Sequence, residues 1–142
     1  MLKKIFLASD HGGYRLKELV KDFLNKKKQP IEDLGCFSLD AVDYPDYAKL
    51  LSDKLKNDLN SQGILFCGTG IGISMAANRY SHIRAALCTT AEMASKSRKH
   101  NNANVLALGG RIITDSLATD IVNEFLNTDF EAGRHSLRVN KI

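Results

Sequence analysis

The sequence contains few cysteines and none of the spacings that hold a structural metal ion or a disulfide framework. Its three cysteines, Cys36, Cys67 and Cys88, are odd in number and far apart, and no CxxC pair occurs. This pattern argues against a disulfide scaffold and against a zinc site. The four histidines show no HExxH or comparable ligand spacing. We therefore expect a reduced protein with neither a bound metal ion nor a cofactor.

Long apolar runs are also missing from the sequence. No stretch approaches the ~20 apolar residues that a membrane span requires. The apolar run that follows Met1-Leu2-Lys3-Lys4 is only about four residues long, too short for the hydrophobic region of a signal peptide. The expectation is a cytoplasmic enzyme or binding domain that has no membrane partner.

The composition is that of one soluble domain. The chain has 142 residues, of which 44% are apolar and 25% are charged, and this length is close to the commonest domain size. Residues 1–142 are therefore predicted to form a single domain. The net charge of +4 would suit a nucleic-acid partner, but lysines gather at 26–28, at the expected end of a helix. A solvated face explains them better, and binding of phosphorylated small molecules is an equally good use of the charge.

Short apolar runs alternate with amphipathic segments along the whole chain. The runs lack polar alternation, as expected of strands buried on both faces of a parallel sheet. We expect an α/β fold of the Rossmann-like type, a five-stranded parallel sheet with helices on both faces. The expected strands are 5–8, 31–34, 64–66, 83–88 and 105–108. The first expected helix follows Gly13 and stops before Pro30, and the others lie near 44–59, 73–78, 91–99 and 117–126.

The first helix shows this patterning most clearly. Apolar residues recur on one face from Leu16 to Leu24, and the helix must end before Pro30. Its opposite side carries Arg15, Lys17 and other charged residues, which we expect to face solvent.

The hexapeptide Cys67-Gly68-Thr69-Gly70-Ile71-Gly72 follows the third expected strand and precedes a helix. Free backbone N–H groups at a glycine turn before a helix can bind an anion, and the same position favours the thiolate of Cys67. Cys67 is therefore either a nucleophile or base, or the last packed residue of a buried strand. The spacing is not that of a Walker loop or of GxGxxG, so it favours a small anion over a nucleotide.

Polar residues follow the first, third and fifth expected strands. The carboxyl ends of parallel strands share one edge of the sheet, which is where open α/β sheets bind ligands. Asp10 and His11 are read either as ligands or as a helix cap and a structural histidine. The residues expected at this edge are Asp10, His11, Cys67, Thr69 and Arg111.

Further candidates occur late in the chain. His100 and Asn101 end a predicted helix, where a histidine can serve either as a cap or as a catalyst. Arg134 and Arg138 are four residues apart, so one helical turn would place both on one side, which suits a phosphate dianion. Two arginines at this position are otherwise ordinary surface charge.

Taken together, these motifs resemble those of the type B ribose-5-phosphate isomerases, in the wider family that includes galactose-6-phosphate isomerase subunits. The resemblance covers essentially the whole chain. It is carried by Ser9-Asp10-His11-Gly12-Gly13-Tyr14, Asp43-Tyr44-Pro45, Cys67 to Gly72 with Ile73-Ser74, Ala76-Ala77-Asn78, Arg98-Lys99-His100-Asn101, Gly109-Gly110-Arg111, and Gly133-Arg134-His135 with Arg138.

The resemblance implies a metal-free interconversion of ribose 5-phosphate and ribulose 5-phosphate in the pentose phosphate pathway. It implies that Cys67 moves the proton between carbons 1 and 2, and that His100 assists ring opening with Asp10 and Thr69 in support. It further implies a homodimer whose sites are built from both subunits, with pairing into tetramers left open. Expected substrate contacts are the amides of Gly68, Thr69, Gly70, Ile71 and Gly72 at the enediolate, Asp10, Tyr44 and Asn101 at the sugar, and His11, Arg111, Arg134 and Arg138 at the phosphate.

Two rival functions remain open from the sequence. The first is the same chemistry on a six-carbon substrate, galactose or allose 6-phosphate. The depth of the pocket decides between this substrate and a five-carbon one. A non-catalytic domain that senses a sugar phosphate or a nucleotide is the other, although the presence of both Cys67 and His100 argues against it. Some relatives replace the cysteine and use a carboxylate base two positions after the loop. Here Ser74 stands at that position, so we prefer the thiol.

Overall fold

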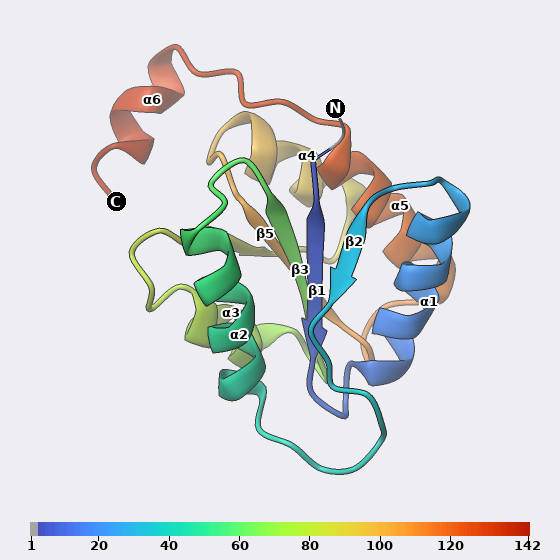
Figure 1. Ribbon diagram of the computed structural model, residues 1–142. Coiled ribbons are helices and arrows are strands. Elements are labelled where there is room, and N and C mark those ends of the chain that lie inside the picture. Colours follow the sequence, from blue (N-terminus) through green and yellow to red (C-terminus); the bar gives the residue numbers. More distant parts are fainter. Residues whose placement is uncertain (1–2) are drawn as a thin grey trace.

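A computed structural model describes residues 3–142 of the chain. Its five strands form one all-parallel sheet in the order β2-β1-β3-β5-β4 (Figure 1). Every residue of β1, β3 and β5 is buried, because these three strands are covered on both faces. The fold class expected from the sequence is confirmed. The strands are β1 (Ile5–Ser9), β2 (Ile31–Asp33), β3 (Gln62–Cys67), β4 (Ala85–Leu87) and β5 (Val105–Gly109).

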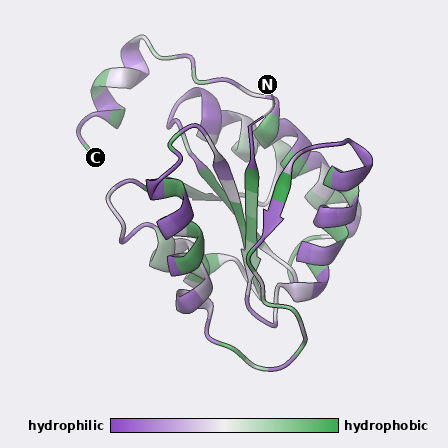
Figure 2. Ribbon diagram, viewed as in Figure 1, coloured by the Kyte–Doolittle hydropathy of each residue, from purple (hydrophilic) through white to green (hydrophobic). Residues whose placement is uncertain are grey.

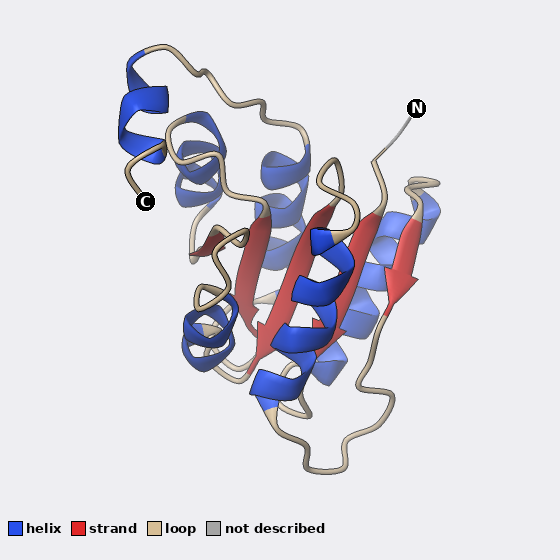
Figure 3. Cartoon of the chain, turned by 60° about the vertical axis from the view of Figure 1, so that its left-hand side comes forward, coloured by secondary structure: helices blue, strands red, loops and turns tan. Residues whose placement is uncertain are grey.

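Helices form two layers around this sheet (Figure 3). Helices α1, α4 and α5 pack on one face, against side chains such as Leu7 and Phe66. Helices α2 and α3 pack on the other face, against alternate residues of the same strands, including Ala8 and Leu65. Figure 2 shows the apolar residues concentrated in the central strands and on the inward sides of the helices. The helices are α1 (Tyr14–Lys26), α2 (Tyr44–Lys56), α3 (Ile71–Ala77), α4 (Ala91–Lys99), α5 (Asp115–Leu126) and α6 (Arg134–Val139).

Some element boundaries differ from the sequence expectation. Helix α2 stops at Lys56, with Asn57 as its C-cap, so Leu59 lies outside the helix and is 76% exposed. Strand β4 is shorter than residues 83–88 because only Ala85–Leu87 pair with β5. Helix α3 begins two residues earlier than expected, at Ile71.

Lys17 is a clear error of the sequence expectation. The helical pattern placed it among the solvated charges of α1, yet its side chain is fully buried. Its ammonium donates hydrogen bonds to both carboxylate oxygens of Asp33, at 2.8 and 2.7 Å, and Lys21 also pairs with Asp33. Burial of this charge is tolerated because the carboxylate compensates it.

The direction of the chain separates two edges of the molecule. Strands run toward the bottom of Figure 1, so the loops after them lie at that edge, whereas α6 lies at the opposite, amino-terminal edge. Within residues 3–142, no helix is both long and apolar enough to cross a membrane.

Candidate active site

The loops that follow β1, β3 and β5 meet at the carboxyl edge of the sheet. The amide of Gly110 donates to the carbonyl of Cys67 at 2.8 Å, and the amide of Arg111 donates to the carbonyl of Gly68 at 2.9 Å. A Cβ at Gly12 would lie only 3.0 Å from the nitrogen of Gly68, so the β1 loop also touches the β3 loop. The convergence expected from the sequence is confirmed.

Cys67 is the last residue of β3 and is 5% exposed. It packs within the apolar core on the α2 and α3 side, while its Sγ accepts a hydrogen bond of 3.0 Å from the amide of Gly70. The residue therefore both ends a buried strand and presents a sulfur to the glycine loop. The amide of Gly70 thus fixes where the sulfur lies relative to the glycine loop.

Gly70 and Gly109 fit the loop tightly onto the sheet. Gly70 has φ +81°, the left-handed conformation that glycine adopts without strain, and a Cβ at Gly109 would lie 2.5 Å from the carbonyl oxygen of Thr69. The Thr69 hydroxyl accepts a hydrogen bond from the amide of Ile71 at 3.2 Å. Two loop amides, those of Gly70 and Ile71, are thus already directed at side chains of the loop.

Asp10 and His11 occupy the β1 loop. The carboxylate of Asp10 is buried, and one of its oxygens accepts a hydrogen bond from the amide of Gly13 at 3.1 Å. The amide of Val42 donates to Nδ1 of His11 at 3.2 Å. In the neutral imidazole this assigns the proton to Nε2 of His11. The N-cap of α1 is Gly13, and it has no side-chain cap hydrogen bond, so Asp10 closes the turn before the helix and does not cap it. The second carboxylate oxygen of Asp10 is left available.

Tyr44 and Arg111 border the loop from two sides. A Cβ at Gly72 would lie 2.7 Å from Cζ of Tyr44, and one at Gly68 would lie 3.3 Å from Nη1 of Arg111. The tyrosine ring and the guanidinium therefore lie directly against the backbone of these two glycines. A larger residue in place of either glycine would push the neighbouring side chain away. Both side chains are exposed, so both can meet a ligand.

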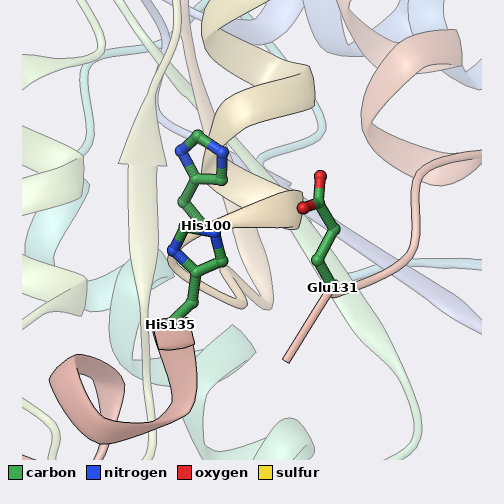
Figure 4. A group of neighbouring side chains, drawn as sticks. All are labelled: His100, Glu131 and His135. Atoms are coloured by element: carbon green, nitrogen blue, oxygen red, sulfur yellow. The ribbon is translucent and has the colours of Figure 1, made fainter. Parts of the chain in front are cut away.

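The remaining candidates gather at the opposite edge. His100, Asn101, Arg134 and Arg138 line one pocket of about 490 Å³, together with His135. His100 is the C-cap of α4, and its imidazole stacks on that of His135 with ring centroids 4.3 Å apart (Figure 4). The expectation that Arg134 and Arg138 share one side of a helical turn is confirmed.

Sequence spacing indicates no role for His135 or Glu131. His135 is buried, and burial lowers its pKa, which the neighbouring charge of His100 lowers further. Glu131 stands beside the stacked pair (Figure 4). Neither residue could be placed from spacing, because both meet His100 only through the loop that joins α5 to α6.

The sequence candidates therefore form two groups within one chain. His100 precedes β5, and Gly109, which pairs with Cys67, ends it. At about 3.3 Å per residue, β5 alone separates the two edges by about 13 Å. One group comprises Asp10, His11, Tyr44, Cys67 to Gly72 and Arg111, and the other comprises His100, Asn101, Arg134 and Arg138.

Known proteins are similar to this chain in sequence and in fold. A family model described as Ribose/Galactose Isomerase matches residues 5–142. Ribose-5-phosphate isomerase B of Escherichia coli is 40% identical over 99% of this chain and 95% of its own length. A probable ribose-5-phosphate isomerase B of Mycoplasma pneumoniae is 48% identical over 97% of this chain and 91% of its own length.

Solved structures agree with the sequence relatives. A ribose 5-phosphate isomerase of Thermotoga maritima superposes with a TM-score of 0.96 at 51% identity, covering 98% of this chain and 96% of its own. Ribose-5-phosphate isomerase B of Mycoplasma genitalium, solved with bound ribulose 5-phosphate, gives a TM-score of 0.95 at 46% identity, covering 99% of this chain and 94% of its own. The chain thus belongs to the ribose/galactose isomerase family, and its expected resemblance to the type B ribose-5-phosphate isomerases is confirmed.

Proposed function

We propose that this protein interconverts ribose 5-phosphate and ribulose 5-phosphate, with Cys67 as the base, as a cytoplasmic enzyme of the pentose phosphate pathway. The observation that carries the proposal is the position of Cys67. Its sulfur lies at the carboxyl edge of the sheet and receives an N–H donor from the glycine loop, where the loops after β1, β3 and β5 meet. Relatives that bear the ribose-5-phosphate isomerase name support the choice of substrate.

The reaction transfers one proton between adjacent carbons of the open-chain sugar. The thiolate of Cys67 takes the proton from carbon 2 of the aldose, and the electron pair released forms the enediolate. The resulting thiol then returns the proton to carbon 1, while the hydroxyl proton on the oxygen of carbon 2 passes to the oxygen of carbon 1, which gives the ketose and restores the thiolate. Because the base recovers its starting form, the cycle needs neither a cofactor nor a metal ion.

The developing enediolate oxygen carries negative charge that the site must stabilise. Backbone N–H groups held in place before the reaction do this, and loss of one such donor costs about 3–4 kcal/mol of barrier in comparable sites. In the loop, the amides of Gly70 and Ile71 are directed at Sγ and Oγ1. We assign the amides of Gly68, Thr69 and Gly72 to the substrate oxygens, with the Thr69 hydroxyl and Asp10 beside them.

Ring opening and phosphate binding require the second group of residues. His100 is the acid–base group that assists opening of the furanose ring, because an imidazole can both donate and accept a proton. Arg134 and Arg138 grip the phosphate together with His11 and Arg111, and Asn101 and Tyr44 contact the sugar. Binding energy from the phosphate then positions the reacting carbons.

These assignments require two copies of the chain in each site. Cys67 and His100 lie at opposite edges of one chain, so a site containing both forms only when the α6 edge of one copy meets the carboxyl edge of another. We therefore infer a homodimer with two shared sites. Exposed apolar side chains, among them Met75 on α3 and Leu137 on α6, support such a contact.

A coupled assay tests the proposed substrate. We expect turnover of ribose 5-phosphate with a higher specificity constant than that of galactose 6-phosphate or allose 6-phosphate, and activity undiminished by EDTA. A preference for a six-carbon phosphate would replace the substrate and leave the chemistry intact. Tight binding of ribose 5-phosphate without any isomerisation would instead favour a sensing domain and overturn the proposal.

A further inference from the structure

Three side chains of metal-ligating type converge at the amino-terminal edge, outside the glycine loop. One ligand atom from each of His100, Glu131 and His135 lies within 4.8 Å of the others. The two imidazoles come from α4 and α6, and Glu131 lies in the segment between α5 and α6 (Figure 4). Within residues 3–142 this is the one group of three or more potential ligands that meets this distance.

The backbone holds this group in place before any ligand arrives. The amide of Glu131 donates to the carbonyl of Lys99 at 3.1 Å, directly beside His100. Thr128 lies three residues before Glu131, and its carbonyl accepts a hydrogen bond of 3.0 Å from Nε of Arg98. The segment that carries Glu131 is therefore tied to the end of the helix that carries His100.

The side chains must rearrange to hold an ion. The imidazoles are stacked, with 16° between their planes, and a metal ion must lie in the plane of each ring that binds it. Rotation about the terminal torsion of a histidine has a broad range, so one ring can turn out of the stack. Glu131 is exposed, and its carboxylate is free to follow.

We propose that His100, Glu131 and His135 bind one divalent transition-metal ion, of which Zn²⁺ fits best, and that the bound ion inhibits the isomerase. Two imidazoles and one carboxylate form a common three-ligand set for Zn²⁺, with a fourth position left for water. Imidazole also disfavours the hard ions Mg²⁺ and Ca²⁺. The ion occupies the imidazole of His100, which the proposed mechanism needs for ring opening.

The surrounding charges limit the affinity without preventing binding. Arg134 and Arg138 line the same pocket and repel a cation, but both are exposed, so salt screens them. The carboxylate of Glu131 offsets part of this repulsion. The expected site is accordingly inhibitory and reversible, compatible with an enzyme that needs no metal ion for turnover.

Metal binding is tested first, on the full chain and without reference to activity. Wild type, Glu131→Gln and His135→Gln are titrated with Zn²⁺ alone by calorimetry, and with Co²⁺ as a spectroscopic probe. The matched control is His82→Gln, because His82 lies against the carbonyl of Ser52, away from the cluster. Circular dichroism verifies that each variant is folded.

We expect one Zn²⁺ per chain in wild type and in His82→Gln, with affinity weakened at least about tenfold in His135→Gln and in Glu131→Gln. The Co²⁺ spectrum is expected to show nitrogen and oxygen ligands only. Unchanged binding in both cluster variants, absence of binding to wild type, or a thiolate-to-cobalt band from a cysteine ligand would each overturn the proposed site.

Inhibition is tested second, and this half of the inference rests on the proposed isomerase function. Each protein is compared with its own metal-free rate on ribose 5-phosphate. Zn²⁺ is expected to inhibit wild type and His82→Gln reversibly, with EDTA restoring the rate, and Glu131→Gln is expected to need at least about tenfold more Zn²⁺. Binding at the cluster without inhibition would overturn the inhibitory role. A protein with no isomerase activity would remove the proposed function while leaving the binding result decisive.

Discussion

The backbone amide of Gly70 donates a hydrogen bond to Sγ of Cys67 at 3.0 Å. This contact exists because Gly70 takes a left-handed conformation, with φ +81°, which turns the chain back over the end of β3. The strand, the turn and the sulfur therefore form one unit. A change in the conformation of Gly70 is expected to move its amide away from Sγ of Cys67.

Gly70→Ala should lower both stability and turnover. A left-handed alanine costs about 1–2 kcal/mol, and its Cβ would also lie 2.6 Å from Cδ1 of Leu87. Denaturant unfolding should therefore show a loss of at least about 1–2 kcal/mol in Gly70→Ala, and turnover should fall in the folded variant. Unchanged stability and turnover would contradict this account of the turn.

Cys67 and Cys88 should differ in reactivity toward iodoacetamide. Burial raises the pKa of Cys88 to about 11, so at pH 8 only about one part in a thousand of it is thiolate. Cys67, with its amide donor, is expected to be alkylated faster, with parallel loss of activity and protection by ribose 5-phosphate. Peptide mapping identifies the labelled residue. Inactivation that tracks labelling of Cys88 would contradict this account.

Mixed dimers test whether sites are shared. Cys67→Ala and His100→Ala should each be severely impaired alone. In a refolded equimolar mixture, half of the dimers carry both variants, and each of these has one intact site. Recovered activity should approach about a quarter of the wild-type value, as expected for a symmetric two-site dimer. No gain over the separate variants would place the two residues in independent sites.

The buried pair of Lys17 and Asp33 should govern acid stability. Burial raises the pKa of Asp33, but hydrogen bonds from Lys17, from the amide of Gly35 and from Lys21 outweigh it and hold the pKa below its usual range. A lowered pKa contributes stability that is present above the unfolded value, 3.8, and lost as the pH falls through the folded value. Unfolding should therefore become easier below about pH 4.

Asp33→Asn isolates this contribution. Removing one partner of a buried pair costs about 3–5 kcal/mol, so the variant should be less stable at pH 7 and should lose part of the acid-dependent change. Asp53→Asn is the control, because its pair with Lys49 is exposed and should barely affect unfolding. Similar effects of the two substitutions would show that burial of Lys17 is unimportant.

Much of the fold follows from local pattern, and its exceptions have physical causes. The runs at Ile64 and Val105 are apolar on both faces, which is why their strands could be predicted. The prediction for Lys17 is wrong because a helical pattern cannot reveal that Asp33, on strand β2, pairs with it. Leu59 was assigned to α2 because periodicity continued past Asn57, where the helix ends.

The candidate site was only partly accessible from sequence. The loops after β1, β3 and β5 share an edge by the geometry of a parallel sheet, so Asp10, Cys67 and Arg111 could be grouped. The separation of His100 from Cys67 was also available in principle, because a helix that leads into β5 must end at the opposite edge. The stacking of His100 on His135 could not be predicted from the sequence, since it depends on how the segment after α5 returns to α4.

The central claim is that Cys67 moves the proton. Its most direct test is turnover of ribose 5-phosphate by Cys67→Ala. Exchange of the substrate's carbon-bound hydrogen is followed in deuterated water at the same time. Cys88→Ala is the matched control. We predict that Cys67→Ala folds and binds a phosphate analogue but neither isomerises nor exchanges, while Cys88→Ala does both. Near-normal turnover or exchange in Cys67→Ala would contradict the account.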